Sequence, residues 1–120
     1  MNDIFYLLEK DVKSEDICEV LKDNKDVKIY INKDGSAFTV EYMDKIHTEW
    51  YKISIDEFEY IASHGNIETI YCISHHSKYI SYLIPEIKKI LTRFGGLIGN
   101  DNEDCKPLFS SDNIHDFTYE

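Results

Sequence analysis

The sequence predicts a single α+β domain over residues 1–120, with a mainly antiparallel sheet of about five strands and two or three helices packed on it. Short segments that alternate apolar and polar residues are separated by tight turns, which is typical of antiparallel strands. Lys78 to Phe94 instead carries apolar residues at spacings of three and four, which predicts one long helix. A chain of 120 residues with 42% hydrophobic residues is large enough for one buried core.

The N-terminal segment predicts a strand followed by a helix. Ile4 to Leu8 is an uninterrupted apolar run, too short to span a membrane and flanked by charges unlike those of a signal peptide. We therefore expect a first strand there. Ser14 is expected to cap a helix that reaches about Asp23, because Ile17, Val20 and Leu21 recur at helical spacing.

A β-hairpin and a third strand are expected next. Val27 to Ile31 alternates like a half-buried strand, Lys33-Asp34-Gly35 supplies a turn, and Ala37 to Met43 returns antiparallel. His47 to Ile53 alternates again, so it should extend the meander.

Two further elements precede the long helix. Ser54 and Glu57 have the spacing of a capping box, which predicts a short helix ending near Gly65. Glu68 to Ser74 is rich in β-branched and aromatic residues and predicts a strand.

The long helix contains Pro85 and is followed by two glycines. Pro85 predicts either a kink or a fresh helix start with the proline in its first turn. Gly95 or Gly96 is expected to adopt a left-handed conformation that closes the helix. Leu97 and Ile98 would then turn back as a short strand.

The charge balance bears on partners. Twenty-three acids against thirteen bases give a net charge of −10, which argues against direct binding to a phosphate backbone. A strongly acidic chain attracts basic proteins through long-range fields. Simple solubility explains the same composition, so both interpretations stay open.

Two segments hold most of the surplus negative charge. Residues 98–120 carry six acids against Lys106, and no base lies between Lys52 and Lys78. If the helix predicted after Ser54 packs near the loop after the long helix, the two segments form one acidic face. The sequence leaves this adjacency open.

The sequence does not predict a catalytic, cofactor or metal site, and the chain is not expected to be an enzyme. Cys18, Cys72 and Cys105 are odd in number and widely spaced, which favours free thiols in a reducing cytoplasm. His75 and His76 follow Cys72, but no second ligand pair completes a zinc motif. A cysteine-histidine enzyme or metal site therefore remains only as an alternative, and it would need Cys72 with His75 or His76 in one cleft.

Nine tyrosines and one tryptophan are more than a core of this size is expected to bury completely. Tyrosine and tryptophan are enriched in protein interfaces, where they serve as desolvated anchors. Cross-strand packing within the sheet is the competing explanation for any one of them.

Residues Phe94 to Asp101, "FGGLIGND", and the later "SSDNIHDF" resemble the C-terminal part of small cytosolic immunity proteins from bacterial polymorphic-toxin and contact-dependent inhibition systems. The likeness covers Lys78 to Phe117. It implies a compact α+β domain without catalytic activity that binds one cognate toxin domain, often a basic nuclease, and neutralises it. No contact residues transfer from those families.

Together these observations predict an acidic, aromatic surface that binds a basic toxin, without direct contact to nucleic acid or membrane. The candidate partner-binding residues are Trp50, Asp56, Glu57, Glu59, Tyr60, Asp101, Glu103 and Asp104. A small regulatory or scaffold domain would share every one of these features. The oligomeric state is left open, because an unpaired strand edge beside exposed aromatic residues can also pair with itself.

Overall fold

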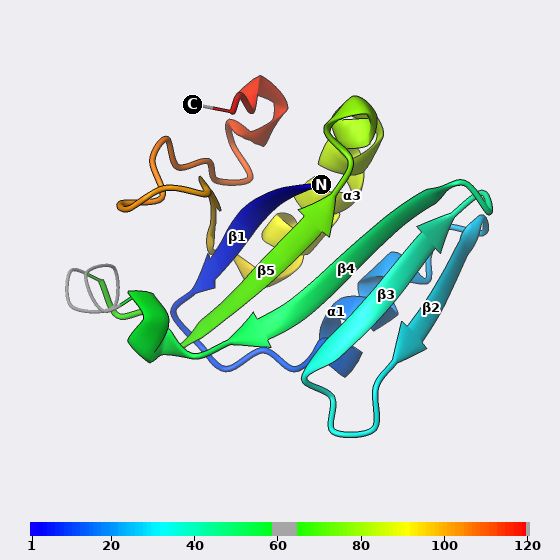
Figure 1. Cartoon of the computed structure of the whole chain (residues 1–120), viewed down its shortest axis with the longest axis horizontal. Helices are drawn as coiled ribbons and strands as arrows, with labels where there is room; N and C mark the ends of the chain where they lie inside the picture. Colours follow the sequence, from blue (N-terminus) through cyan, green and yellow to red (C-terminus); the bar gives the residue numbers. More distant parts are fainter. Residues whose placement is uncertain (59–64, 120) are drawn as a thin grey trace.

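A six-stranded antiparallel sheet organises the chain, in the strand order β2-β3-β4-β5-β1-β6 (Figure 1). The computed structural model describes residues 1–58 and 65–119, apart from the side chains of residues 57 and 58. The strands are β1 (Asn2–Leu8), β2 (Val27–Ile31), β3 (Ala37–Tyr42), β4 (Ile46–Ile53), β5 (Thr69–His75) and β6 (Leu97–Asn100). The α-helices are α1 (Ser14–Leu21) and α3 (Ile80–Phe94), and short 3₁₀ turns are η1 (Ile55–Phe58), η2 (Ser77–Tyr79) and η3 (Ile114–Asp116). The predicted α+β class is confirmed, with one strand more than expected.

Strand β1 lies in the interior of the sheet. It pairs with β5 from Asn2 opposite His75 to Leu8 opposite Thr69. Its other side pairs with β6 from Ile4 opposite Asn100 to Leu7 opposite Leu97. The continuous apolar run at the N-terminus is explained by this position, because β1 is covered on both faces.

The two α-helices of the described residues, α1 and α3, lie on the same face of the sheet, behind the strands in the view of Figure 1. Beneath them the larger core cluster includes Tyr6, Trp50, Tyr71 and Ile90, all at most 2% exposed. Trp50 stacks on Phe38, with ring centroids 5.4 Å apart. This helix-covered face therefore holds most of the buried aromatic area.

Ser14 has a different role from the predicted helix cap. Lys13 occupies the N-cap position of α1, and no side chain caps the helix there. The Ser14 hydroxyl is buried and instead donates a hydrogen bond of 2.6 Å to the Gly35 carbonyl in the β2–β3 turn. Tertiary contact thus replaces local capping.

Pro85 lies inside α3, so the predicted fresh start at the proline is wrong. Gly95 and Gly96 both have positive φ, of 77° and 90°, as the double glycine predicts. A Cβ atom on Gly96 would lie 2.5 Å from the Leu7 carbonyl oxygen. The glycine therefore allows the chain after α3 to approach β1 closely.

The C-terminal segment covers the outer edge of β6. Ile98 and Phe109 exchange two backbone hydrogen bonds of 2.8 Å, and the Asn100 amide bonds the Cys105 carbonyl at 2.8 Å. Further on, Tyr119 donates its hydroxyl toward Nε2 of buried His75 at 2.6 Å. In the described part of the chain, no helix has the length and apolar character needed to span a bilayer.

Candidate functional site: the open face of the sheet

The face of the sheet opposite the two helices, called here the open face, is built by side-chain parity. Successive residues of a strand point to opposite faces, so the strand register fixes which side chains are neighbours. One row across the open face runs Tyr30–Thr39–Glu49–Ser74–Asp3. The next rows are Lys28–Glu41–His47 on one side and Ala37–Tyr51–Cys72–Phe5–Gly99 on the other.

One end of the open face is covered by chain from two other parts of the sequence. Phe5, Leu7, Ile70, Cys72 and Cys105 form a second buried cluster there. Ile55 of η1 and Leu108 of the loop after β6 both pack against this cluster. The two acidic segments therefore approach the same end of the open face, which is the adjacency that the sequence left open.

Gly99 allows that loop to lie flat on β6. A Cβ atom at this position would lie 2.7 Å from the Cys105 carbonyl oxygen and 2.8 Å from the Cys105 Cβ. A larger residue would lift the loop, together with Asp101 and Asp104, away from the sheet.

The uncovered part of the open face carries carboxylates around one histidine. His47 Nδ1 lies 3.6 Å from Glu41 Oε1, and His47 Nε2 lies 3.5 Å from Glu49 Oε1. The Glu49 side chain is 51% exposed and that of Glu41 is 34% exposed. Both carboxylates are thus available to a partner.

Asp3 is held in place by its neighbours in the same and the adjacent row. The Ser74 hydroxyl donates a short hydrogen bond to Asp3 Oδ1, and the Tyr51 hydroxyl lies 3.2 Å from Ser74 Oγ. These contacts fix the carboxylate on a rigid strand before any partner arrives. Such preorganisation lowers the entropic cost of binding.

The geometry does not favour Cys72 and His75 as a catalytic pair. Cys72 belongs to the open face, whereas His75 lies on the opposite face of β5 and is fully buried. Burial raises the pKa of the Cys72 thiol to about 11, which disfavours the nucleophilic thiolate. Within residues 1–58 and 65–119, no group of three or more His, Cys, Asp and Glu side chains is placed to hold a metal ion.

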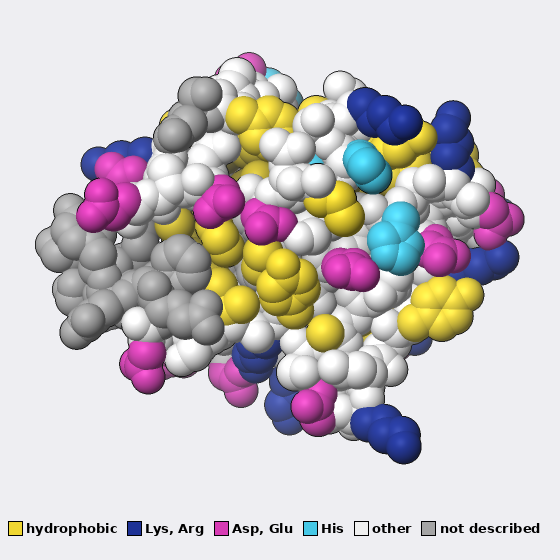
Figure 2. All heavy atoms as spheres, in the orientation of Figure 1, with side chains coloured by type: hydrophobic (Ala, Val, Ile, Leu, Met, Phe, Trp, Pro, Cys, Tyr) yellow, Lys and Arg dark blue, Asp and Glu magenta, His cyan; other side chains and the backbone are white. Residues whose placement is uncertain are grey.

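Basic side chains surround the open face rather than occupying it. Figure 2 shows Asp and Glu side chains in a row over this face, with apolar side chains beside them and Lys and Arg near the margin. Lys28 is the basic member of the rows described above, and it bonds Asp44 at 2.6 Å. On the helical side, by contrast, acids of α1 share a pocket with Arg93.

The surplus acids are therefore divided between the two sides of the molecule. Asp16, Glu19 and Asp23 lie on the helical side, in a pocket that they share with Arg93 of α3. Among the residues of the three open-face rows described above, Lys28 is the one Lys or Arg.

Trp50 is the predicted anchor that the structure contradicts. It is 2% exposed because its position in β4 points toward the helices, where it packs between Phe38 and Tyr71. Its ring stabilises the core and is not accessible to a partner. Tyr51, the next residue along β4, lies on the open face instead.

The predicted acidic residues fall into two groups. Asp101 and Glu103 are exposed and Asp104 is half-buried in the loop that lies on β6, and Asp56 is exposed in η1. The backbone amide of Asp56 donates to the Ser54 hydroxyl at 3.3 Å, whereas the predicted capping box rests on the Glu57 side chain and so is not tested by the described residues. The side chain of Glu57, all of Glu59 and Tyr60, and the helix expected to end near Gly65 lie outside the described residues.

Sequence reasoning missed the central members of the face, namely Asp3, Glu41, His47 and Glu49. Within β4, alternation alone groups His47 with Glu49 on the side away from Trp50, whereas adding Glu41 requires the β3–β4 register. The order of the strands, which brings Asp3 beside them, requires long-range pairing that no local pattern encodes.

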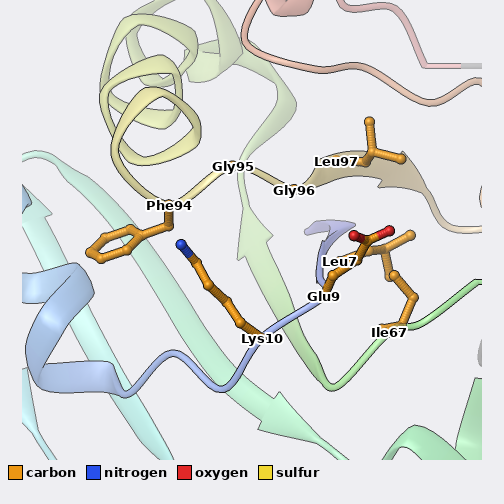
Figure 3. Close-up of a pocket in the computed structure, with 8 residues that line it drawn as sticks. All are labelled: Leu7, Glu9, Lys10, Ile67, Phe94, Gly95, Gly96 and Leu97. Atoms are coloured by element: carbon orange, nitrogen blue, oxygen red, sulfur yellow. The ribbon is translucent and has the colours of Figure 1, made fainter.

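A separate concavity of about 450 Å³ lies where β1, β6 and the end of α3 meet. Figure 3 shows the Lys10 amine directed toward the Phe94 ring, with Glu9, Leu7 and Ile67 farther along the pocket. Among the described residues that line it, there is one ammonium group, one carboxylate and no nucleophile. These groups define no reaction.

Comparison with known proteins supplies no relative for this fold or site: no protein-family model, curated protein or solved structure matches the chain.

Proposed function

We propose that this chain is a non-catalytic inhibitory protein that binds a basic partner protein through the open face of its sheet. In its specific form, the proposal is that the partner is a cognate toxin domain and the chain is its immunity protein. The observation that carries the proposal is the row of carboxylates on the open face, with cations at its margin.

Charge complementarity supports a basic partner. Asp3, Glu41 and Glu49 would face Lys and Arg side chains, which in a nuclease hold the phosphates of the substrate. Occupying those side chains would prevent the substrate from binding. The long-range field of a chain with net charge −10 would speed the encounter.

Aromatic groups supply the less polar part of the interface. Tyr51 is half-buried beside the carboxylates, and Tyr30 at the end of the same face is 57% exposed. Tyrosine contributes contact area and a hydroxyl at a low entropic cost. The combination suits a partner with cationic and planar side chains.

Charge reversal at two places tests the proposed face. One variant combines Glu41→Lys with Glu49→Lys, and the other combines Asp101→Lys, Glu103→Lys and Asp104→Lys. Each should slow association with the cognate toxin by about tenfold or more at low salt, with less effect at high salt. Surface plasmon resonance at two ionic strengths measures both rates.

The matched control reverses two acids on the helical side, Asp16→Lys with Glu19→Lys. It changes the net charge as much as the Glu41 and Glu49 double variant does. If the control slows association equally, net charge rather than the open face governs binding. If neither of the two open-face variants slows association with the toxin, the open face is not the interface.

The partner itself is sought in the product of the adjacent gene, because immunity genes accompany toxin genes. Co-expression should rescue cells from that product, and the two proteins should co-purify. Rescue by the wild-type chain and loss of rescue in the Glu41 and Glu49 double variant are the expected results. Failure of the wild-type chain to rescue or bind would reject the toxin-specific form of the proposal.

A further inference from the structure

Strand β2 is an edge of the sheet with which no other described strand pairs besides β3, whereas the opposite edge is covered. β2 pairs with β3 on one side, and it is the outermost element at its end of the sheet in Figure 1. At the other end, the C-terminal segment bonds β6 through Ile98 and Phe109. An unpaired strand edge offers backbone donors and acceptors to another strand.

The hydrogen-bond pattern identifies which backbone groups of β2 point outward. Asn32 donates to Ala37 at 3.0 Å and Met43 donates to Asp26 at 2.8 Å, which makes the even-numbered residues of β2 the ones bonded to β3. The peptide groups of Val27, Ile29 and Ile31 therefore face away from the sheet. The Val27 amide makes a long bond of 3.4 Å to the Asn24 carbonyl.

We propose that two copies of this chain pair antiparallel through β2, about a two-fold axis at Ile29, to form one continuous sheet. This register places Ile29 opposite Ile29 and Ile31 opposite Val27 of the second copy. Ile29 and Ile31 of each copy can then donate across the interface, to carbonyls of Ile29 and Val27 respectively. A register shifted by two residues pairs only two of the three outward-facing positions with each other.

The side chains of β2 are compatible with this arrangement. Tyr30 is 57% exposed and Ile31 is 40% exposed, which are high values for large apolar side chains. In the proposed register, Lys28 lies opposite Tyr30 of the second copy, a pairing that favours a cation–π contact. Ile31 becomes covered beside Val27, on the helical side of the sheet.

Local charge allows two acidic chains to approach at this edge. Residues 25–34 contain Lys25, Lys28 and Lys33 against Asp26 and Asp34, so the segment is close to neutral in a chain of net charge −10. Two copies would repel each other through the open face but not through β2. This edge is thus suited to a second copy, and the inference does not depend on the proposed function.

Sedimentation equilibrium of the full chain from about 1 μM to about 1 mM tests the proposal. The average mass should rise from 14.1 kDa toward twice that value and stop there. Amide hydrogen exchange at Ile29 and Ile31 should slow as concentration rises. A mass that stays at 14.1 kDa across the range would overturn the proposal.

Two variants locate the interface. Ile29→Pro removes an outward donor but no bond to β3, and Ile31→Lys places a charge at the pairing edge. Each should lower the association constant by about tenfold or more. Met43→Lys is the control, because it makes the same type of change at an exposed residue outside β2.

Circular dichroism establishes that each variant keeps the fold. If Ile29→Pro does not fold, Ile31→Lys and the hydrogen-exchange measurement still decide the question. Association that persists unchanged in Ile31→Lys, or that weakens equally in Met43→Lys, would place the contact elsewhere and overturn the proposal.

Discussion

The two faces of this sheet are made by alternate residues of the same strands, yet they differ in chemistry. Trp50 and Tyr51 are adjacent in β4, but Trp50 is sealed under the helices while Tyr51 borders the carboxylates of the open face. The helical side mixes acids with the cations of α3, and the open face keeps cations at its margin. Parity therefore separates residues that stabilise the fold from residues available for binding.

The largest difference in stability between the two faces should appear when the adjacent residues Trp50 and Tyr51 of β4 are each replaced by alanine. Trp50→Ala should lower the free energy of unfolding by about 3–5 kcal/mol, because it removes a buried ring that stacks on Phe38. Tyr51→Ala should cost about 1 kcal/mol, since its side chain is only half-buried. Urea denaturation measures both, and similar costs for the two would contradict the separation of faces.

Two glutamates provide a second, smaller contrast. Glu86 on α3 is buried and bonds Asn24 Nδ2 at 2.8 Å and Lys89 Nζ at 2.7 Å. Glu86→Ala should lower the free energy of unfolding by about 1–3 kcal/mol, because it removes the buried carboxylate that accepts from Asn24 and Lys89 and leaves Asn24 only its longer contact to the Tyr82 hydroxyl. Glu49→Ala on the open face should change it by less than about 0.5 kcal/mol. Thermal and urea unfolding measure the cost of each variant. A larger cost for Glu49→Ala than for Glu86→Ala would contradict the prediction.

The smallest contrast concerns pH. Burial lowers the pKa of His75, which therefore binds a proton less readily in the folded chain than in the unfolded chain. Its contribution to stability is complete above the ordinary histidine pKa of about 6.5 and is lost progressively as pH falls below that value. Tyr119→Phe should also cost about 1 kcal/mol at neutral pH, through loss of the hydroxyl that bonds His75.

A pair of histidine variants assigns this pH dependence to one side of the sheet. His75→Gln should flatten the loss of stability below about pH 6.5. His47→Gln, on the open face, should retain that loss. A loss that disappears only in His47→Gln would show that the buried histidine is not its source.

Much of the fold could be predicted because its signals are local. The alternation in residues 27–53 predicted three consecutive strands, and the three-and-four spacing before Gly95 predicted α3. The error at Ser14 has a physical cause: its hydroxyl finds the Gly35 carbonyl, a partner 21 residues away. Pro85 is likewise accommodated inside a helix that packs against the core.

The candidate site was less accessible to prediction, because it depends on which strands are neighbours. Asp101 and Asp104 were identified from the concentration of acids after β6. Asp3, Glu41 and Glu49 come from three strands, and only the order β3-β4-β5-β1 brings them into one region. Trp50 was misassigned because a tryptophan in an alternating strand can point either way.

The interior position of β1 also has a consequence for how the molecule forms. The two neighbours of β1 lie later in the sequence, in residues 69–75 and 97–100, so β1 cannot pair until those residues have been synthesised. Nucleation by the β2–β3–β4 meander, whose contacts are short-range, would precede its insertion. Until then, the apolar residues Ile4–Leu8 lack both of the strands that flank them in the folded sheet, and an exposed apolar strand with unpaired edges is prone to aggregate.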